Sequence, residues 1–519
     1  MILTTTNLNL LYLDGHLRYI KHGEEEIIRM VYTALRNDHW FTLPMQISKE
    51  TIIQNESSFS IQYHAQYVLG DIDYEADIEI LGTADDVLSF HFKGKAKTDF
   101  LRNRIGVCVL HPIHNSLGQA VIVTQPDGDE VAAIFPTLIE PNIAFENIVQ
   151  FAWKTRGGVG ASLEFEGDVF ESEDQRNWSD NSFKTYSTPV SIPFPVLVKS
   201  GDEVEQKVTL SFWQDVVVRS AKLPDEDKKE ILVPFPRIGY ASNDRPLTDA
   251  HVEMLKQIKF DHYRVEIDFA EGWLNTFRKA CAEAEVLDVG IELVVLFGDY
   301  VPEYNLLRDS FSSRLGSMTI LQKHASTPTQ GLLDYLIPRL KSDFPSIRIG
   351  SGTNGHFVAI NRTRTIDSRL DFISYGVTPL AHLSDDLTLK ENLEAQQYPL
   401  KTLRSFTDLP MHISPVTLRS RDYPALTIDP RQHTPMMADW TTMSLKYLAG
   451  ADQITFFEII GPKGIINESG PSPIYDVLKR ITDFQPKYII PTQVMHPLME
   501  DSLVLENAAG ERMELKVVF

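Results

Sequence analysis

Eight short apolar runs alternate with helix-like segments over roughly 250 residues in the second half of the chain. The runs are Ile231–Tyr240, His262–Ile267, Ile291–Phe297, Met318–His324, Ile347–Gly350, Phe372–Gly376, His412–Val416 and Ile454–Glu458. Eight strands that each feed a helix are the pattern of a (β/α)8 barrel, and a doubly wound sheet is the alternative. We therefore predict a TIM-type barrel domain over residues 225–486.

The first part of the chain has the period of strands instead. Tyr12–His16 places Asp-Gly between two alternating runs, which predicts a hairpin, and Phe59–Tyr67 alternates as a half-buried antiparallel strand does. These patterns predict an antiparallel β-sandwich domain (supersandwich-like) over residues 1–224, ended by the charged, Pro-led linker 224–230. The tail 487–519 ends in one alternating strand and predicts a short C-terminal β element. The expected class is an α+β multidomain protein.

Charge and cysteine content restrict the partners. The net charge of −22 and pI near 5.1 argue against nucleic acid or an anionic membrane as the main partner. Cys108 and Cys281 have no neighbours at metal-site spacing, and two cysteines provide no disulfide framework. The N-terminus lacks a basic, apolar signal pattern, so a cytoplasmic protein is expected.

Several familiar catalytic motifs are missing from the sequence. It contains no G-x-S-x-G, H-E-x-x-H or H-x-H, and no cofactor or metal site is expected. His111 and His114 are separated by a proline and lack further ligands. Gly350–Gly355 matches G-x-G-x-x-G, but it lies at the end of the fifth strand, where a tight barrel turn is the better interpretation than a dinucleotide site.

Polar residues gather at the carboxyl ends of the predicted strands, where barrel enzymes carry their sites. Alternation puts Arg264, Glu266 and Asp268 on one face of the second strand, as an ion pair or a substrate clamp. Glu458 shares its face with Ile454 and Phe456, which predicts a desolvated, inward carboxylate suited to acid–base work. Further strand-end candidates for polarising a carbonyl or binding hydroxyls are His324, Asn354, Tyr375 and His382.

A polar segment without apolar period, Gly167–Tyr186, carries five carboxylates together with Arg, Lys, Asn and aromatic side chains. Together with Thr98–Pro112 it resembles the D-apionate lactonase family, and the elements around Arg264–Glu266, Gly352–Asn354, Ser374–Val377 and Phe457–Glu458 fall where that family has similar ones. The resemblance covers nearly the whole chain. It implies hydrolysis of a branched aldonolactone to its free acid during apiose breakdown. One departure is Ala359, at a position where an acidic residue is expected.

Lactone hydrolysis needs an activated water, a site for the developing oxyanion and a proton for the leaving alkoxide. We assign the general base or acid to Glu458 or Glu266, and polarisation of the carbonyl to His324 or Arg264. We expect the polar segment to lie over the barrel mouth and to help bind the small-molecule sugar lactone. Residues expected to bind its hydroxyls or the new carboxylate are Asn103, Arg104, Asp174, Arg176, Asn177 and Lys184.

Two other functions fit the same residues. A glycoside hydrolase would use Glu266 and Glu458 as its pair of carboxyl groups, since the second and eighth strands are separated only by the first. A non-catalytic sugar-binding protein would instead present aromatic platforms without desolvated carboxylates.

Overall fold

The structure is a computed structural model that describes residues 1–213, 231–310, 312, 314–421, 428–492 and 497–519. The predicted linker 224–230 lies outside the described residues. The chain forms two compact units. The sandwich unit comprises Met1–Gln175 and Asn181–Pro224, and the barrel unit comprises Arg176–Asp180 and Asp225–Phe519. A five-residue piece of the polar segment thus belongs to the barrel unit.

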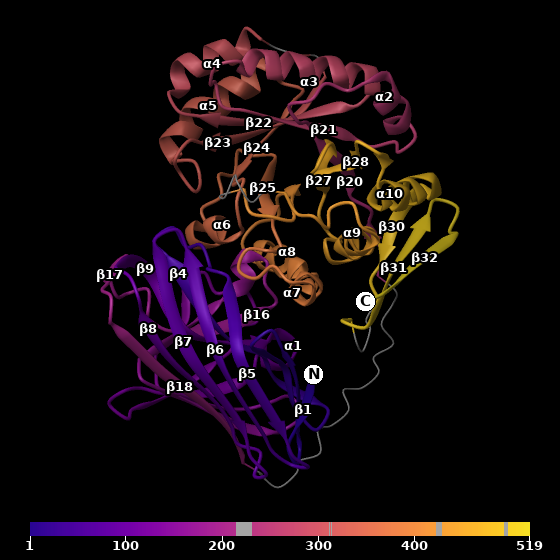
Figure 1. Ribbon diagram of the computed structural model, residues 1–519. Helices are drawn as coiled ribbons and strands as arrows, with labels where there is room; N and C mark the ends of the chain where they lie inside the picture. The colour runs from indigo at the N-terminus through magenta and orange to yellow at the C-terminus, as the bar shows by residue number, and fades with distance from the viewer. Residues whose placement is uncertain (214–230, 311, 313, 422–427, 493–496) are drawn as a thin grey trace. The chain divides into compact units, whose positions relative to one another are not determined.

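The sandwich unit contains two nine-stranded antiparallel sheets (Figure 1, indigo to magenta). The first has the order β1 (Ile2–Thr4), β2 (Leu8–Leu13), β3 (His16–His22), β4 (Glu25–Asn37), β9 (Phe100–Pro112), β16 (Ser182–Tyr186), β15 (Phe170–Asp174) and β12 (Ile143–Ile148), with β17 (Val196–Val198) beside β9. The second has the order β11 (Glu130–Ile134), β10 (Ala120–Thr124), β13 (Gln150–Lys154), β14 (Gly160–Glu166), β18 (Glu203–Trp213), β8 (Leu88–Ala96), β7 (Ile72–Gly82), β6 (Phe59–Leu69) and β5 (Met45–Gln54).

Alternating apolar residues hold these two sheets face to face. Leu17 and Ile28 from the first sheet and Phe90, Val208 and Leu210 from the second line one small internal gap. The predicted hairpin is present, because Leu13 pairs with His16 across the Asp-Gly turn. The antiparallel sandwich is therefore confirmed. Two short helical turns, α1 (Ile113–Ser116) and η1 (Gln175–Trp178), interrupt the strands.

Eight parallel strands form the barrel, and the pairing of the first with the eighth closes it. They are β20 (Arg237–Ala241), β21 (His262–Ile267), β22 (Gly290–Phe297), β23 (Leu315–Gln322), β24 (Arg348–Gly352), β25 (Phe372–Val377), β26 (Met411–Val416) and β27 (Gln453–Ile460). The hairpin of β28 (Gly464–Asn467) and β29 (Gly470–Pro471) adds to the sheet beside β27, because β28 pairs with β27 in parallel. The predicted TIM-type barrel is confirmed.

Helices follow most of the strands and cover the outside of the barrel (Figure 1). They are α2 (Asp249–Leu255), α3 (Trp273–Leu287), α4 (Tyr300–Arg308), α5 (Gln330–Asp343), α6 (Val358–Thr363), α7 (Asp386–Glu391), η2 (Glu394–Gln396), α8 (Gln397–Arg404), α9 (Pro435–Tyr447) and α10 (Pro473–Phe484). In the described part of the chain, no helix has the length and apolar character needed to cross a membrane.

The first apolar run is divided between two sheets. Val233–Pro234 forms β19, which pairs with β30 (Pro486–Ile490) and not with the barrel. Pro234 and Pro236 lack the N–H that a continuous central strand needs, so the barrel strand begins only at Arg237. The predicted C-terminal β element is confirmed as the sheet β19, β30, β31 (Glu500–Asn507) and β32 (Arg512–Val518).

Gly350–Gly355 forms the end of β24 and the turn after it, in a closed barrel. At Gly352, with a φ of +148°, a Cβ atom would lie 1.9 Å from the carbonyl oxygen of Ser374 on β25. This glycine is required by the close approach of two strands, which accounts for it without a bound phosphate.

Candidate active site at the barrel mouth

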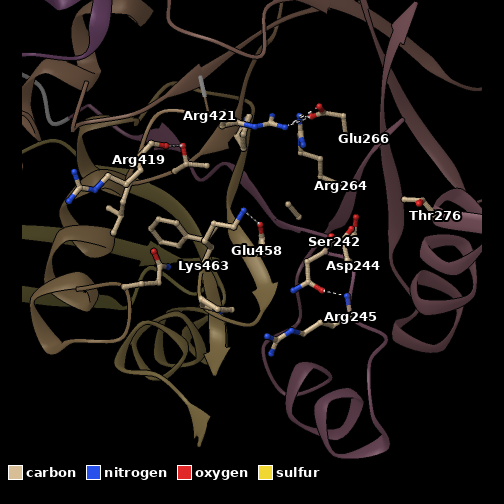
Figure 2. Close-up of a pocket in the computed structure, with 18 of the residues that line it drawn as sticks. Ser242, Asp244, Arg245, Arg264, Glu266, Thr276, Arg419, Arg421, Glu458 and Lys463 are labelled. Carbon is tan, nitrogen blue, oxygen red and sulfur yellow. Dashed lines mark hydrogen bonds and ion pairs between the residues drawn. The ribbon is translucent and has the colours of Figure 1, made fainter. Parts of the chain in front are cut away.

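A cavity of about 610 Å³ opens at the carboxyl ends of five barrel strands. That volume is within the range of small-molecule sites. The lining comes from β20, β21, β22, β26 and β27 and the loops after them (Figure 2). Its charged residues are Asp244, Arg245, Arg264, Glu266, Asp268, Arg419, Arg421, Glu458 and Lys463. Four of them, Arg264, Glu266, Asp268 and Glu458, were predicted from their positions at strand ends.

Glu266 is the most highly bonded carboxylate in the cavity (Figure 2). Its Oε2 accepts hydrogen bonds from Arg264 Nη2 at 2.9 Å, from Asn354 Nδ2 at 2.9 Å and from Arg421 Nη2 at 2.9 Å. Arg421 also donates to Oε1 at 3.0 Å, and Arg264 donates to Asn354 Oδ1 at 2.8 Å. The side chain of Arg264 is only 4% exposed. Residues from β21 and from the loops after β24 and β26 thus form one fixed network.

This network determines the protonation state of Glu266. Burial alone raises the pKa of a carboxyl group, but the charges of Arg264 and Arg421 outweigh it and lower the pKa of Glu266 from 4.5 to about 2. The carboxylate is therefore charged at neutral pH and is a weak base. Its chemical effect is to hold two guanidinium groups at the wall of the cavity.

Glu458 reaches the cavity by a route that strand alternation did not predict. Thr455 faces the barrel interior, where its hydroxyl meets His262 Nε2 at 2.8 Å and donates to Glu292 Oε2 at 2.7 Å. Ile454 and Phe456 are therefore on the opposite, outward face. Phe457 then adopts a left-handed backbone with a φ of +51°, and the register with β20 shifts at this point. This bulge turns Glu458 back toward the mouth.

Glu458 is only partly desolvated. Its side chain is 21% exposed, and its Oε1 lies 2.6 Å from Lys463 Nζ. Ala241 pairs with Arg264 on one side and with Glu458 on the other, so the two Cα atoms are about 10 Å apart across β20. The Glu458 carboxylate thus lines the same cavity as Arg264 and Arg421.

Several cavity residues were not expected from the sequence. Arg419 and Arg421 follow β26, and Lys463 follows β27, so the strand-end rule applied to the seventh and eighth strands could have found them. Arg419 Nε donates to Asp429 Oδ2 at 2.8 Å.

Three expected residues take no part in this cavity or its network. His324 is exposed in a turn beyond β23, with a φ of +59°. Tyr375 is fully buried on β25, where its ring packs 5.5 Å from that of Phe357. His382 Nδ1 lies 2.5 Å from Asp180 Oδ2. Of the two residues expected to polarise a carbonyl, Arg264 alone lines the cavity.

The piece Arg176–Asp180 packs on elements that follow β24 and β25. Asn177 Oδ1 accepts from Asn361 Nδ2 at 3.0 Å, and Asp180 Oδ1 accepts from Asn392 Nδ2 at 3.0 Å. The Arg176 guanidinium stacks 4.9 Å from the ring of Tyr398. These side chains contact α6, α8 and the turn after α7, whereas the cavity is lined from β20, β21, β22, β26 and β27.

The other expected binding residues lie in the sandwich unit. Lys184 Nζ pairs with Glu173 Oε1 at 2.7 Å, across β16 and β15. Asp174 Oδ2 accepts from the backbone N–H of Glu140 at 3.0 Å. Asn103 Nδ2 donates to the carbonyl of Asp38 at 3.2 Å, and Arg104 lies beside it on β9.

The low pKa of Glu266 gives a testable dependence of stability on pH. A carboxyl group with a depressed pKa in the folded state stabilises the protein above its unfolded pKa, and this contribution is lost as the pH falls toward its folded pKa. Between about pH 6 and pH 3, wild-type protein should lose about 2 kcal/mol of unfolding free energy more than Glu266→Gln does, since 1 pKa unit corresponds to about 1.4 kcal/mol. Urea unfolding of the barrel transition at several pH values measures it. Equal slopes for the two proteins would contradict the network.

Known proteins resemble this chain over nearly its whole length. A family model described as the D-apionate lactonase N-terminal domain matches residues 1–215, and one described as the D-apionate lactonase TIM barrel domain matches residues 237–486. A protein of Brucella anthropi named D-apionate lactonase is 26% identical over an aligned length of 524 positions, and the alignment covers 90% of this chain and 85% of that protein.

Solved structures resemble it more weakly. An α-L-arabinofuranosidase from Thermotoga maritima has a TM-score of 0.41 at 12% identity, covering 56% of this chain and 84% of its own. A glycoside hydrolase family 30 subfamily 8 xylanase from Clostridium acetobutylicum has a TM-score of 0.38 at 10% identity, covering 54% of this chain and 79% of its own. The two family models together span both units, so the chain belongs to the D-apionate lactonase family and is a lactonase, a carboxylic ester hydrolase.

Proposed function

We propose that the barrel-mouth cavity hydrolyses a D-apionolactone-type branched aldonolactone to its free aldonic acid in apiose catabolism. The family and the name of the Brucella anthropi relative support this substrate class. The observation that carries the assignment to this cavity is its pair of guanidinium groups, Arg264 and Arg421, held by Glu266 in a cavity that a second carboxylate, Glu458, also lines. Both cysteines are free, which fits the expected cytoplasmic setting.

The proposed reaction begins with Glu458 as the general base. Glu458 takes a proton from a water molecule while the water oxygen bonds to the lactone carbonyl carbon. The carbonyl π electrons move to the oxygen, and the guanidinium groups of Arg264 and Arg421 stabilise the resulting oxyanion. The tetrahedral intermediate collapses, the ring C–O bond breaks, and the leaving alkoxide takes the proton held by Glu458. The new carboxylate is a natural ligand for the same arginines.

Lys463 and Glu266 act on these groups indirectly. Lys463 holds Glu458 Oε1 and leaves Oε2 for the water. Glu266 orients Arg264 and Arg421 and remains charged throughout. This division differs from a glycoside hydrolase, which needs one of its two carboxyl groups protonated before reaction. Glu266 has a pKa of about 2, so it is not arranged as that acid.

A substrate panel tests the proposed function. Purified protein is assayed with a branched aldonolactone, with unbranched aldono-γ-lactones and with nitrophenyl glycosides, using proton release for the lactones and absorbance for the glycosides. We expect hydrolysis of the branched lactone with the highest kcat/KM and no turnover of glycosides. Release of nitrophenol without lactone hydrolysis would contradict the proposal and favour a glycoside hydrolase.

A further inference from the structure

Arg104 on β9 places a guanidinium group inside the sandwich unit without a full set of acceptors. The residue is 6% exposed. Its Nη1 donates to the carbonyl oxygen of Asn103 at 2.5 Å. Its Nε and Nη2 atoms are buried and have no hydrogen-bond partner among the described residues. An unpaired buried donor on a charged group is destabilising, so such a group calls for a ligand that satisfies it.

The two unpartnered nitrogens form one edge of the guanidinium plane. Nε–H and Nη2–H point in parallel, and this edge is the fork that binds a carboxylate through two hydrogen bonds. Aromatic rings pack on one side of the guanidinium, because the ring of Trp40 lies 5.3 Å and the ring of Phe194 lies 5.0 Å from its carbon, and the two ring centres are only 5.0 Å apart. These contacts hold the guanidinium in place and supply no hydrogen-bond acceptor to its buried Nε–Nη2 edge.

Neighbouring side chains of the same sheet are already engaged with one another. Tyr186 donates to Glu171 Oε1 at 2.6 Å, and the backbone N–H of Val190 donates to the same oxygen at 2.6 Å. Glu173 is paired with Lys184. The negative charges of Glu171 and Glu173 interact electrostatically with Arg104, but neither carboxylate accepts a hydrogen bond from its Nε or Nη2 atom. The cluster therefore offers hydroxyl-binding groups, and its guanidinium edge lacks an acceptor among the residues that the structure describes.

We propose that this face of the sandwich, formed by β9, β16 and β15, is a second ligand site that binds the carboxylate of a small polyhydroxy acid on Arg104. The fork takes the carboxylate, and the Tyr186–Glu171 and Lys184–Glu173 pairs take ligand hydroxyls. A lactone has no carboxylate, so the site selects the hydrolysed acid over the substrate. The naming of an aldonate as ligand rests on the proposed function, whereas the carboxylate-binding edge does not.

Calorimetric titration of the full-length protein with sodium gluconate, an aldonate probe, tests the site. The titration is run on Arg421→Gln, in which the carboxylate site proposed at the barrel mouth is weakened, and on the same protein carrying Arg104→Lys as well. Lysine keeps the charge but not the fork, so at least tenfold weaker binding is expected. Arg156→Lys, in an exposed turn of the same unit, is the matched control and should leave binding unchanged. Glucono-lactam, which has no carboxylate, should bind at least tenfold more weakly than gluconate.

Trp40 provides a second measurement in case Arg104→Lys does not fold. Gluconate binding beside the Trp40–Arg104 stack should change tryptophan emission in wild-type protein, and Trp40→Phe should remove that change. Equal gluconate affinity with and without the Arg104→Lys substitution, or an emission change that survives Trp40→Phe, would overturn the site. Loss of lactonase activity in Glu458→Gln with gluconate binding retained separates this proposal from the proposed function, since Glu458 belongs to the barrel unit.

Discussion

Replacing Glu458 by Gln should lower kcat for lactone hydrolysis by roughly 10²–10⁴-fold while the protein remains folded, because a positioned general base contributes about that much. The amide has nearly the same shape but cannot take a proton from water. Its contact with Lys463 is at a partly exposed site, where losing one ion pair costs on the order of 1 kcal/mol or less. Initial rates at saturating lactone, together with thermal unfolding, measure both quantities.

Glu253→Gln is the matched control for this change. Glu253 lies on α2, is exposed and does not line the cavity. The Glu253→Gln substitution makes the same chemical replacement in the same unit. Its kcat should stay within about twofold of wild type, because surface substitutions usually have small effects. Near-wild-type turnover by folded Glu458→Gln would assign the base to another group, and Asp244 and Asp268 are the other aspartates that line the cavity.

The periodic part of this fold could be predicted from the sequence, and its irregular part could not. Alternation identified eight barrel strands and the Tyr12–His16 hairpin, because both depend on a repeated pattern of burial. It failed at Glu458, where Phe457 has a positive φ and shifts the register by one residue. A phenylalanine gives no sequence signal for a left-handed backbone, which glycine or asparagine would have given.

The candidate site was predictable to a similar extent. Arg264, Glu266 and Asn354 follow from the rule that functional residues lie at strand ends. Their hydrogen bonds join the second and fifth strands, and only the closed barrel shows that they meet. Arg421 also follows a strand end, after β26, but only the structure shows that it reaches Glu266. Its contact with Glu266 helps to lower the pKa of that carboxyl group, and the proposed function therefore uses Glu266 as an anchor for the arginines.

The polar segment Gly167–Tyr186 shows why composition alone could not assign a role. Its ends form β15 and β16, where Lys184 and Glu173 pair across neighbouring strands. Its middle, Arg176–Asp180, belongs to the barrel unit and bonds to residues such as Asn361 and Asn392. The sequence indicated a high density of polar groups but not which of them satisfy one another.

Replacing Arg264 by Gln should have the second large effect, on activity and stability together. Glu266 and Asn354 would lose their shared donor inside the barrel mouth, and because Arg421 still pairs with Glu266 the expected loss is about 1.5–3 kcal/mol, as for a hydrogen bond to a charged group. The oxyanion would lose one of its two guanidinium groups, which should reduce kcat by roughly 10²–10³-fold.

Urea unfolding and initial rates on Arg264→Gln test both effects, with Arg237→Gln as the control. Arg237 begins β20 in the same barrel, its side chain is 43% exposed, and its Nη1 lies 3.6 Å from Asp261 Oδ2. Removing such an exposed pair should change the unfolding free energy by about 1 kcal/mol or less and leave kcat intact. If Arg264→Gln lost stability but kept its kcat, the role of Arg264 would be structural only, and Arg421 would be left as the single candidate for binding the oxyanion. If it kept both, Glu266 would have no need of Arg264, and the pKa of Glu266 would have to be set by Arg421 alone.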